Sequence, residues 1–409
     1  MHRYRDILGT INYGLFLTMV AALPFPQICL RYTFGAWIIA WFLEARWLQK
    51  IHSTFNIQHS TFILFALWFL WKIVSGLWAP DAAAWQTQIE RYTAFALMLP
   101  VGIWGVNEKY NWRTAGYVLI ASCVVAVPFY IAWMTALYIH PEWVHHFTIH
   151  GQWTYEGNWW VFFSDNISQF KHRLFLCSIE LFACVLAFQL LHQRLALFVP
   201  TLLILFATVP LTGSRQMILT CAALLVIAGI YALPHGKRMK YGLLIAAIGV
   251  GVGGATLAFH PRMQEFNQEP DIRLKIWETA LEEPSDYLVY GLGAGQSTDY
   301  LVEKYREKEI PIAAKKRYHC HNQYLQECME IGLGGALLFL LAWLSIPFST
   351  QGRARRTAIY LTTLFMLNMC TDCMFGMFDG VLLWAVGMVF ILLQRDLTTA
   401  DQSLPLPAA

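Results

Sequence analysis

Two histidines and an asparagine stand directly before an apolar segment in residues 317–335, RYHCHNQYLQECMEIGLGG. His319 and His321 flank Cys320, and Asn322 is a residue type that caps helices. Imidazole titrates near neutral pH, so a histidine at the watery end of an apolar helix is suited to act as a general base. An HxH pair can also bind a metal, but the sequence shows no spacing that supplies the third and fourth ligands. Interfacial histidines with a structural role are the third alternative.

A first arginine stands at the start of another apolar segment, in LTGSRQMILT, residues 211–220. Thr212 or Ser214 is placed to cap a helix that begins at Arg215. The free amides and the positive end of the helix dipole would then lie beside a guanidinium, which predicts an anion site. The alternative is an arginine that marks the membrane boundary and extends its charge to water.

A second arginine lies in DIRLKIWETALEE, residues 271–283. At about 100° per residue, Arg273 falls within the apolar arc of the predicted helix. A charge on the packed side of a helix is costly unless it is paired, so Arg273 indicates either a site or a buried ion pair with Asp271 or Glu269. The apolar arc consists of Ile272, Leu274, Ile276, Trp277, Ala280 and Leu281.

Two other patterns are weaker. GLGAGQ, residues 291–296, is interpreted as a tight turn because no βαβ unit surrounds it, as a dinucleotide fingerprint would require. CTDC, residues 370–373, has the CxxC form but lacks a thioredoxin-like context. We interpret it as packing.

Residues 140–172 are dense in histidine and tryptophan. Such a loop is typical of an aromatic belt at a membrane surface, but flat rings interleaved with hydrogen-bonding groups also suit sugars. We therefore hypothesise a glycan-binding surface here, with His172 and Arg173 adding positive charge at its end. The aromatic and imidazole side chains are His140, Trp143, His145, His146, His150, Trp153, Trp159 and Trp160.

The composition indicates an all-α integral membrane protein. Of 409 residues, 57% are hydrophobic and 13% charged, against about one quarter charged in soluble domains. A net charge of +3 is too small and dispersed to favour nucleic acid. Twelve segments approach the length needed to cross a bilayer as helices. They are 9–28, 31–48, 60–79, 91–106, 115–139, 174–192, 195–211, 215–233, 241–259, 322–347, 357–376 and 378–394.

Basic residues recur in alternate short loops, such as 235–240 and 352–356, which by the positive-inside rule face the cytoplasm. An even number of spans then places both termini in the cytoplasm. Loops 140–172 and 260–321 face outward, the second being a large periplasmic loop before the tenth span. Residues 1–395 are expected to form one polytopic membrane domain, and 396–409 a disordered cytoplasmic tail.

Three motifs together resemble the O-antigen ligase and polymerase superfamily of bacterial envelope glycosyltransferases. They are the SR pair at Arg215, the R-x-x-x-W pattern of Arg273 and Trp277 followed by the GLGAG turn, and HNQYL with Glu330. Gly332 and Gly334 complete the third motif. The resemblance covers about residues 211–340, within an expected ligase-like core at 195–347.

The resemblance implies a GT-C-like fold and transfer of a glycan from an undecaprenyl-diphosphate carrier to an acceptor hydroxyl, without a metal or other cofactor. Arg215 and Arg273 would bind the diphosphate, and His321 would be the base in an inverting attack. The expected setting is the outer face of a bacterial inner membrane, among membrane lipids. Further expected substrate-binding residues are His172, Arg173, Trp277, His319 and Asn322.

The acceptor is open at this level. Lipid A-core would make the protein an O-antigen ligase, another lipid-linked glycan a polymerase, and a protein hydroxyl an O-oligosaccharyltransferase. A transporter or flippase is the alternative of another class. It predicts charges in the centres of spans, whereas the motif residues lie at predicted span ends.

Overall fold

The computed structural model describes residues 2–45, 59–140, 171–212, 214–232, 244, 247, 251, 254 and 272–400. Within these ranges all regular secondary structure is helical, which confirms the all-α prediction. Contacts divide the chain into two compact units. The first comprises Met1–Gln49 with Val106–Arg262, and the second Lys50–Gly105 with Met263–Ala409.

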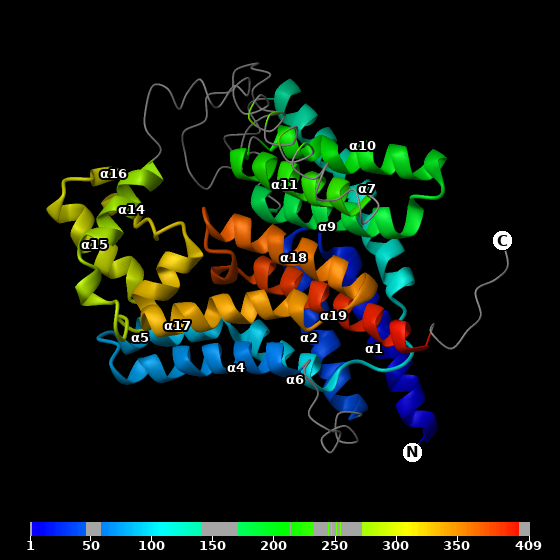
Figure 1. Cartoon of the computed structure of the whole chain (residues 1–409), viewed down its shortest axis with the longest axis horizontal. Helices are drawn as coiled ribbons and strands as arrows, with labels where there is room; N and C mark the ends of the chain where they lie inside the picture. Colours follow the sequence, from blue (N-terminus) through cyan, green and yellow to red (C-terminus); the bar gives the residue numbers. More distant parts are fainter. Residues whose placement is uncertain are drawn as a thin grey trace. The chain divides into compact units, whose positions relative to one another are not determined.

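The first unit contains six described helices of three or more turns, and α7 is the longest (Figure 1). α1 packs against α2 and α7, while α9 packs against α7 and α10. α9 is buried along most of its length because it lies among these apolar neighbours. The helices are α1 (His2–Ala22), α2 (Gln27–Glu44), α7 (Trp112–Ile139), α9 (Arg173–Leu191), α10 (Leu195–Leu211) and α11 (Arg215–Ala232).

The second unit is built on α4 and α17, which lie side by side, with α18 and α19 packed together nearby (Figure 1). Fully buried aromatic side chains, among them Trp68, Phe95, Trp343 and Trp384, fill its core mostly with edge-to-face contacts. The long helices are α4 (His59–Val74), α5 (Ala82–Arg91), α6 (Thr93–Trp104), α17 (Gln323–Phe348), α18 (Gly352–Met369) and α19 (Phe378–Ala400).

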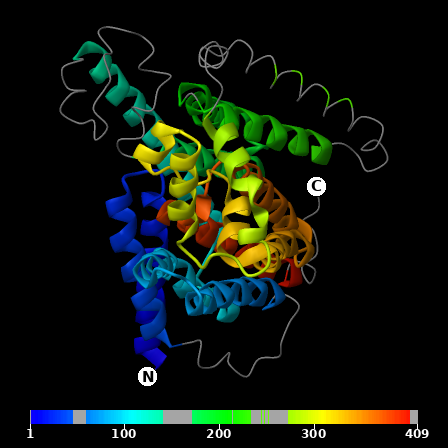
Figure 2. The ribbon, with the colours of Figure 1, turned by 90° about the vertical axis from the view of Figure 1, so that its left-hand side faces the viewer.

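Residues 272–316 are mostly helical and not an irregular loop: besides a short 3-10 helix at Pro284–Asp286, they form three α-helices. They are α14 (Ile272–Glu282), α15 (Ser297–Glu307) and α16 (Pro311–Lys316), which Figure 2 shows in yellow-green and yellow, nearest the viewer. The predicted apolar arc of α14 is wrong at Leu274 and Leu281, which are 51% and 59% exposed. α14 is covered mainly on its α15 side, so only a narrow face around Ile276 and Ala280 is buried.

The GLGAG segment is a tight turn, as predicted, and it packs against a kink in α17. Gly291 and Gly332 have φ of +80° and +73°, a region that glycine enters without steric cost. The Gly293 amide donates to the Glu330 carbonyl at 2.9 Å, and the Leu333 amide to the Leu288 carbonyl at 2.8 Å. A Cβ on Gly332 would lie 2.4 Å from the Val289 carbonyl oxygen. Glycine is therefore required where the two segments meet.

Four described helices are long and apolar enough to cross a membrane: Ser60–Leu77, Trp112–Ala136, Arg173–Leu191 and Gln323–Phe348. Four shorter apolar helices accompany them. Twelve spans and an outward loop 260–321 stay predictions. The fourth predicted span, 91–106, corresponds to α6, which begins at Thr93 after a turn at Tyr92, and α19 runs past residue 396 to Ala400. Residues 141–170, most of 241–259 and residues 401–409 lie outside the described part of the chain.

Candidate active site

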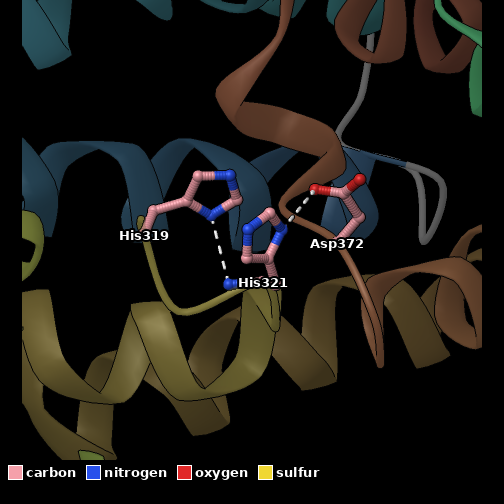
Figure 3. Close-up of side chains that lie close together, drawn as sticks. All are labelled: His319, His321 and Asp372. Atoms are coloured by element: carbon pink, nitrogen blue, oxygen red, sulfur yellow. Dashed lines mark hydrogen bonds and ion pairs between the residues drawn. The ribbon is translucent and has the colours of Figure 1, made fainter. Parts of the chain in front are cut away.

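His319, His321 and Asp372 converge where the segment before α17 meets the segment after α18 (Figure 3). The two imidazole rings lie with centroids 4.0 Å apart, tilted by 37°. His321 Nδ1 lies 3.8 Å from Asp372 Oδ1. The side chains of His321 and Asp372 are 20% and 12% exposed, so the pair is largely withdrawn from water.

Local hydrogen bonds hold the histidine segment in place. The Asn322 side chain accepts from the Leu325 amide at 3.0 Å, which confirms its role as the helix cap, and donates to the Cys370 carbonyl at 3.1 Å. Trp277 on α14 donates its indole N–H to the Cys320 carbonyl at 2.8 Å. Asn322 and Trp277, both predicted to bind substrate, thus make direct contacts that position the histidines.

His321 combines backbone strain with an unmet hydrogen bond. Its φ is +49°, a left-handed conformation that costs a non-glycine residue about 1 kcal/mol or more. Its Nδ1 is buried and makes no hydrogen bond to any residue that the structure describes; the Asp372 carboxylate at 3.8 Å is beyond that range. Strain and unmet polar atoms that persist together are typical of functional sites.

His319 is held neutral. Burial, together with the neighbouring His321 ring and the Arg273 and Arg91 guanidiniums, lowers the pKa of His319 to about 4, against the partial opposition of Asp372. Its Nδ1 accepts the backbone N–H of His321 at 3.1 Å, so the ring proton resides on Nε2. His319 therefore positions the backbone of His321 and carries no charge at neutral pH.

Asp372 is the site residue that sequence reasoning missed. It belongs to the CTDC pattern, which was interpreted as packing. That interpretation holds for Cys373, which is 4% exposed, but not for Asp372. The Cys373 amide donates to the Asp372 carboxylate at 2.8 Å. In the sequence, Asp372 could have been noticed as a carboxylate between two apolar segments.

The three side chains also meet the geometry of a metal cluster. One potential ligand atom from each of His319, His321 and Asp372 lies within 4.8 Å of the others. Spacing along the sequence did not indicate Asp372 as a possible third ligand, because it comes from a distant segment. Against a cation, His319 Nδ1 already accepts a hydrogen bond, and Arg273 and Arg91 place positive charge near the ring. The residues do not favour a resident divalent metal.

A cavity of about 430 Å³ adjoins His319. Its walls come from α5, the 291–296 turn, α15 and the first turns of α17. Arg91 and Arg317 bring positive charge, and Arg317 pairs with Asp299. The other lining residues are Ala84, Thr87, Gln88, Gly295, Thr298, Gln326, Glu330, Cys373, Gly376 and Met377.

Residues 200–340 match the family model described as O-antigen ligase. The match confirms the resemblance that the three motifs predicted, over nearly the same residues. Together with the long apolar helices it supports a multi-pass membrane protein of the ligase and polymerase type. Among curated proteins, none matches the chain.

The residues predicted to bind substrate or take part in transfer fall into both units. Arg273, Trp277, His319, His321 and Asn322 belong to the second unit, and the charge of Arg273 acts on His319. The first unit contains Arg215, His172 and Arg173. These roles in substrate binding stay predictions.

The first unit also shows how Arg215 is presented. α11 begins at Arg215, and Ser214 caps it by accepting the Met217 amide at 3.4 Å. Thr212, the other residue predicted to cap, is buried and donates instead to the Val209 carbonyl at 3.2 Å. The predicted helix start is confirmed, with Ser214 as its cap.

A second buried polar group lies further along α17. Lys72 of α4 is fully buried, and its Nζ lies 2.7 Å from Glu330 and 3.1 Å from Glu327. Trp68 donates to Glu327 at 2.8 Å, and Ser297 to Glu330 at 3.0 Å. Lys72 lies before the matched segment, where no motif was recognised. In the sequence, Lys72 could have been noticed as a single lysine inside an apolar run.

Proposed function

We propose that the protein transfers a glycan from undecaprenyl diphosphate to an acceptor hydroxyl, with His321 as the general base. The observation that carries the proposal is the strained His321 beside Asp372, with Nδ1 unbonded among the described residues, inside the segment that matches O-antigen ligase. A base must reach the proton that it removes and must be oriented by a neighbour. The Asp372 carboxylate, which lies 3.8 Å from His321 Nδ1, is the neighbour that would orient the base.

The proposed reaction is a single inverting displacement. His321 takes the proton of the acceptor hydroxyl as its oxygen attacks the anomeric carbon. The bond between that carbon and the diphosphate oxygen breaks, and its electron pair leaves with undecaprenyl diphosphate. Arg215 and Arg273 would stabilise the charge that grows on the leaving diphosphate, and the imidazolium returns its proton to solvent.

The reaction is proposed to need no metal. His319 already uses Nδ1 within the loop, and the guanidiniums that lower its pKa disfavour a cation at the same place. Transfer by purified protein should therefore continue in chelator. Activity that stops in chelator and returns with one metal ion would show that the His319, His321 and Asp372 cluster is a metal site after all.

The acceptor that we propose is lipid A-core, reached from the periplasmic face of the inner membrane, with both termini cytoplasmic. Gene deletion separates the alternatives. Loss of all attached polymer supports ligation, a single repeat on the core supports a polymerase, and loss of protein-bound glycan alone supports an O-oligosaccharyltransferase.

Buried charges within apolar helices bear on the transporter alternative. Lys72, Glu327 and Glu330 lie inside candidate spans, as a transport pathway would require. They are fully or almost fully buried, both glutamates pair with Lys72, and Lys72 lies near the end of α4. This arrangement favours a structural role over a conducting path. Variants at His321 that still sustained polysaccharide export would favour transport.

The principal test is His321→Ala in a transfer assay with purified protein. Loss of the base should lower the rate about 10²- to 10⁴-fold. His192→Ala, an exposed histidine after α9, is the matched control and should retain the native rate. An unchanged rate in His321→Ala, with a normal thermal unfolding curve for both variants, would refute the proposal.

A further inference from the structure

Two buried glutamines line the cavity with side-chain atoms that no described residue satisfies. Gln88 on α5 is 4% exposed, and its Nε2 has no hydrogen-bond partner among the described residues. Gln326 on α17 is 7% exposed, and its Oε1 likewise has no hydrogen-bond partner among the described residues. Leaving a buried polar atom unpaired costs about 1–3 kcal/mol, so two in one cavity point to a ligand.

The neighbours of each amide decide which end is free. Gln326 Nε2 donates to Glu330 Oε1 at 2.8 Å, and a carboxylate only accepts, so the oxygen of Gln326 is left over. Arg91 donates to Gln88 Oε1 at 3.5 Å, and a guanidinium only donates, so the nitrogen of Gln88 is left over. Each of these two glutamines of the cavity wall therefore keeps one unpaired polar atom, a donor on Gln88 and an acceptor on Gln326.

This pair of atoms selects the chemistry of the ligand. A phosphate oxygen could accept from Gln88 or Arg91, but it could give nothing to Gln326, and Arg317 is already paired with Asp299. A cation would serve Gln326 alone and would meet Arg91. A hydroxyl group both donates and accepts, so neutral polyols satisfy both amides.

The cavity is preformed. The Ala294 amide donates to Ser75 Oγ at 2.9 Å, and Gln296 Nε2 donates to the Asp81 carbonyl at 2.7 Å. These bonds hold the 291–296 turn against residues 75–81, directly before α5. A Cβ on Gly295 would lie 2.6 Å from the Ala84 carbonyl oxygen, so the wall is closely packed. The volume of about 430 Å³ is within the usual range of roughly 300–1,000 Å³ for small-ligand sites.

We propose that this cavity binds one pyranose ring of a substrate glycan, with Gln88 Nε2 and Gln326 Oε1 hydrogen-bonding its hydroxyl groups. The assignment rests on the proposed glycan transfer and names the sugar-binding residues for it. His319 lines the same cavity and contacts His321, so a bound ring lies next to the proposed base. The ring belongs either to the donor glycan or to the end of the acceptor.

The test measures sugar binding apart from catalysis. Methyl glycosides of a hexose and of an N-acetylhexosamine are added to purified full-length protein in detergent, and binding is followed by saturation-transfer NMR. Gln88→Leu and Gln326→Met should each weaken binding about tenfold, the effect of losing one hydrogen bond. If Gln88→Leu does not fold, Gln88→Glu removes the same donor at constant size and can pair with Arg91.

Gln86→Leu is the matched control. Gln86 lies on the same helix, bonds to Glu90 at the surface and does not line the cavity, so binding should stay native. In transfer assays the cavity variants should raise the KM for one substrate about tenfold with little change in kcat. A raised donor KM assigns the ring to the donor, and a raised acceptor KM assigns it to the acceptor.

Each outcome is decisive. If neither glycoside binds the native protein, or if the Gln88 and Gln326 variants bind as the native protein does, the cavity holds only water and the inference is wrong. Glycoside binding that depends on Gln88, in a protein without transfer activity, would refute the proposed function and keep the sugar site. Active transfer with native KM values in both variants would refute the sugar site and keep the proposed function.

Discussion

α17 has two polar groups at its beginning, and they differ in how well their atoms are satisfied. At the helix start, His321 is strained, and its Nδ1 has no hydrogen bond within the described chain. One to two turns further in, Glu327 and Glu330 are hydrogen-bonded by Lys72, Trp68 and other donors. Both groups are shielded from water, so burial alone does not distinguish them.

This difference in hydrogen bonding separates the residues that stabilise the fold from those that act in the reaction. A buried network in which both carboxylates and the ammonium are bonded fixes α4 against α17, because removing either charge leaves its partner uncompensated. An incompletely satisfied group keeps lone pairs and protons available for a substrate. We therefore expect Lys72 to matter first for folding and the His321–Asp372 pair first for turnover.

The largest expected effect comes from Lys72→Met. Removing the lysine leaves two buried glutamates without their cation, which should lower the free energy of unfolding by about 3–5 kcal/mol. Thermal unfolding in detergent measures this loss. Lys275→Met, on the exposed side of α14, is the control and should change stability by less than about 0.5 kcal/mol. If Lys72→Met kept the native melting temperature but lost activity, Lys72 would act in turnover and not in folding.

Asp372→Asn should give an intermediate effect, confined to turnover. Two unit charges about 4 Å apart near a protein surface interact by up to about 4 kcal/mol, and part of this remains with a neutral amide. We expect kcat to fall about 10- to 100-fold with little change in KM or melting temperature. If stability falls instead and kcat of the folded fraction is native, Asp372 serves structure and the division between the two groups fails.

The smallest effect concerns His319 and acid. Its pKa is lowered to about 4, below the usual value near 6.5. Between pH 4 and 6.5 the unfolded state therefore binds more protons than the folded state. The free energy of unfolding should then fall as the pH drops from about 6.5 to 4, with a contribution of about 1–3 kcal/mol. In His319→Gln this contribution should vanish. Parallel stability profiles for native and variant protein across that window would contradict the neutral role of His319.

Sequence patterns predicted the helical class, most helix positions and the motif residues. Apolar length, the cap at Asn322 and the glycines of the 291–296 turn are local properties, so spacing along the chain reveals them. The exposed side of α14 was misjudged because burial there depends on α15, which periodicity does not include.

The partners of the motif residues were decided by tertiary structure. Asp372 lies 51 positions after His321 in sequence, and Lys72 lies 258 positions before Glu330, yet each pair is in contact or nearly so. The free atoms of Gln88 and Gln326 likewise depend on which neighbours took the other end of each amide. Sequence by itself determined which groups could do chemistry. Only the fold decided which of them were left unsatisfied, because hydrogen-bond satisfaction is a property of neighbours brought together in space.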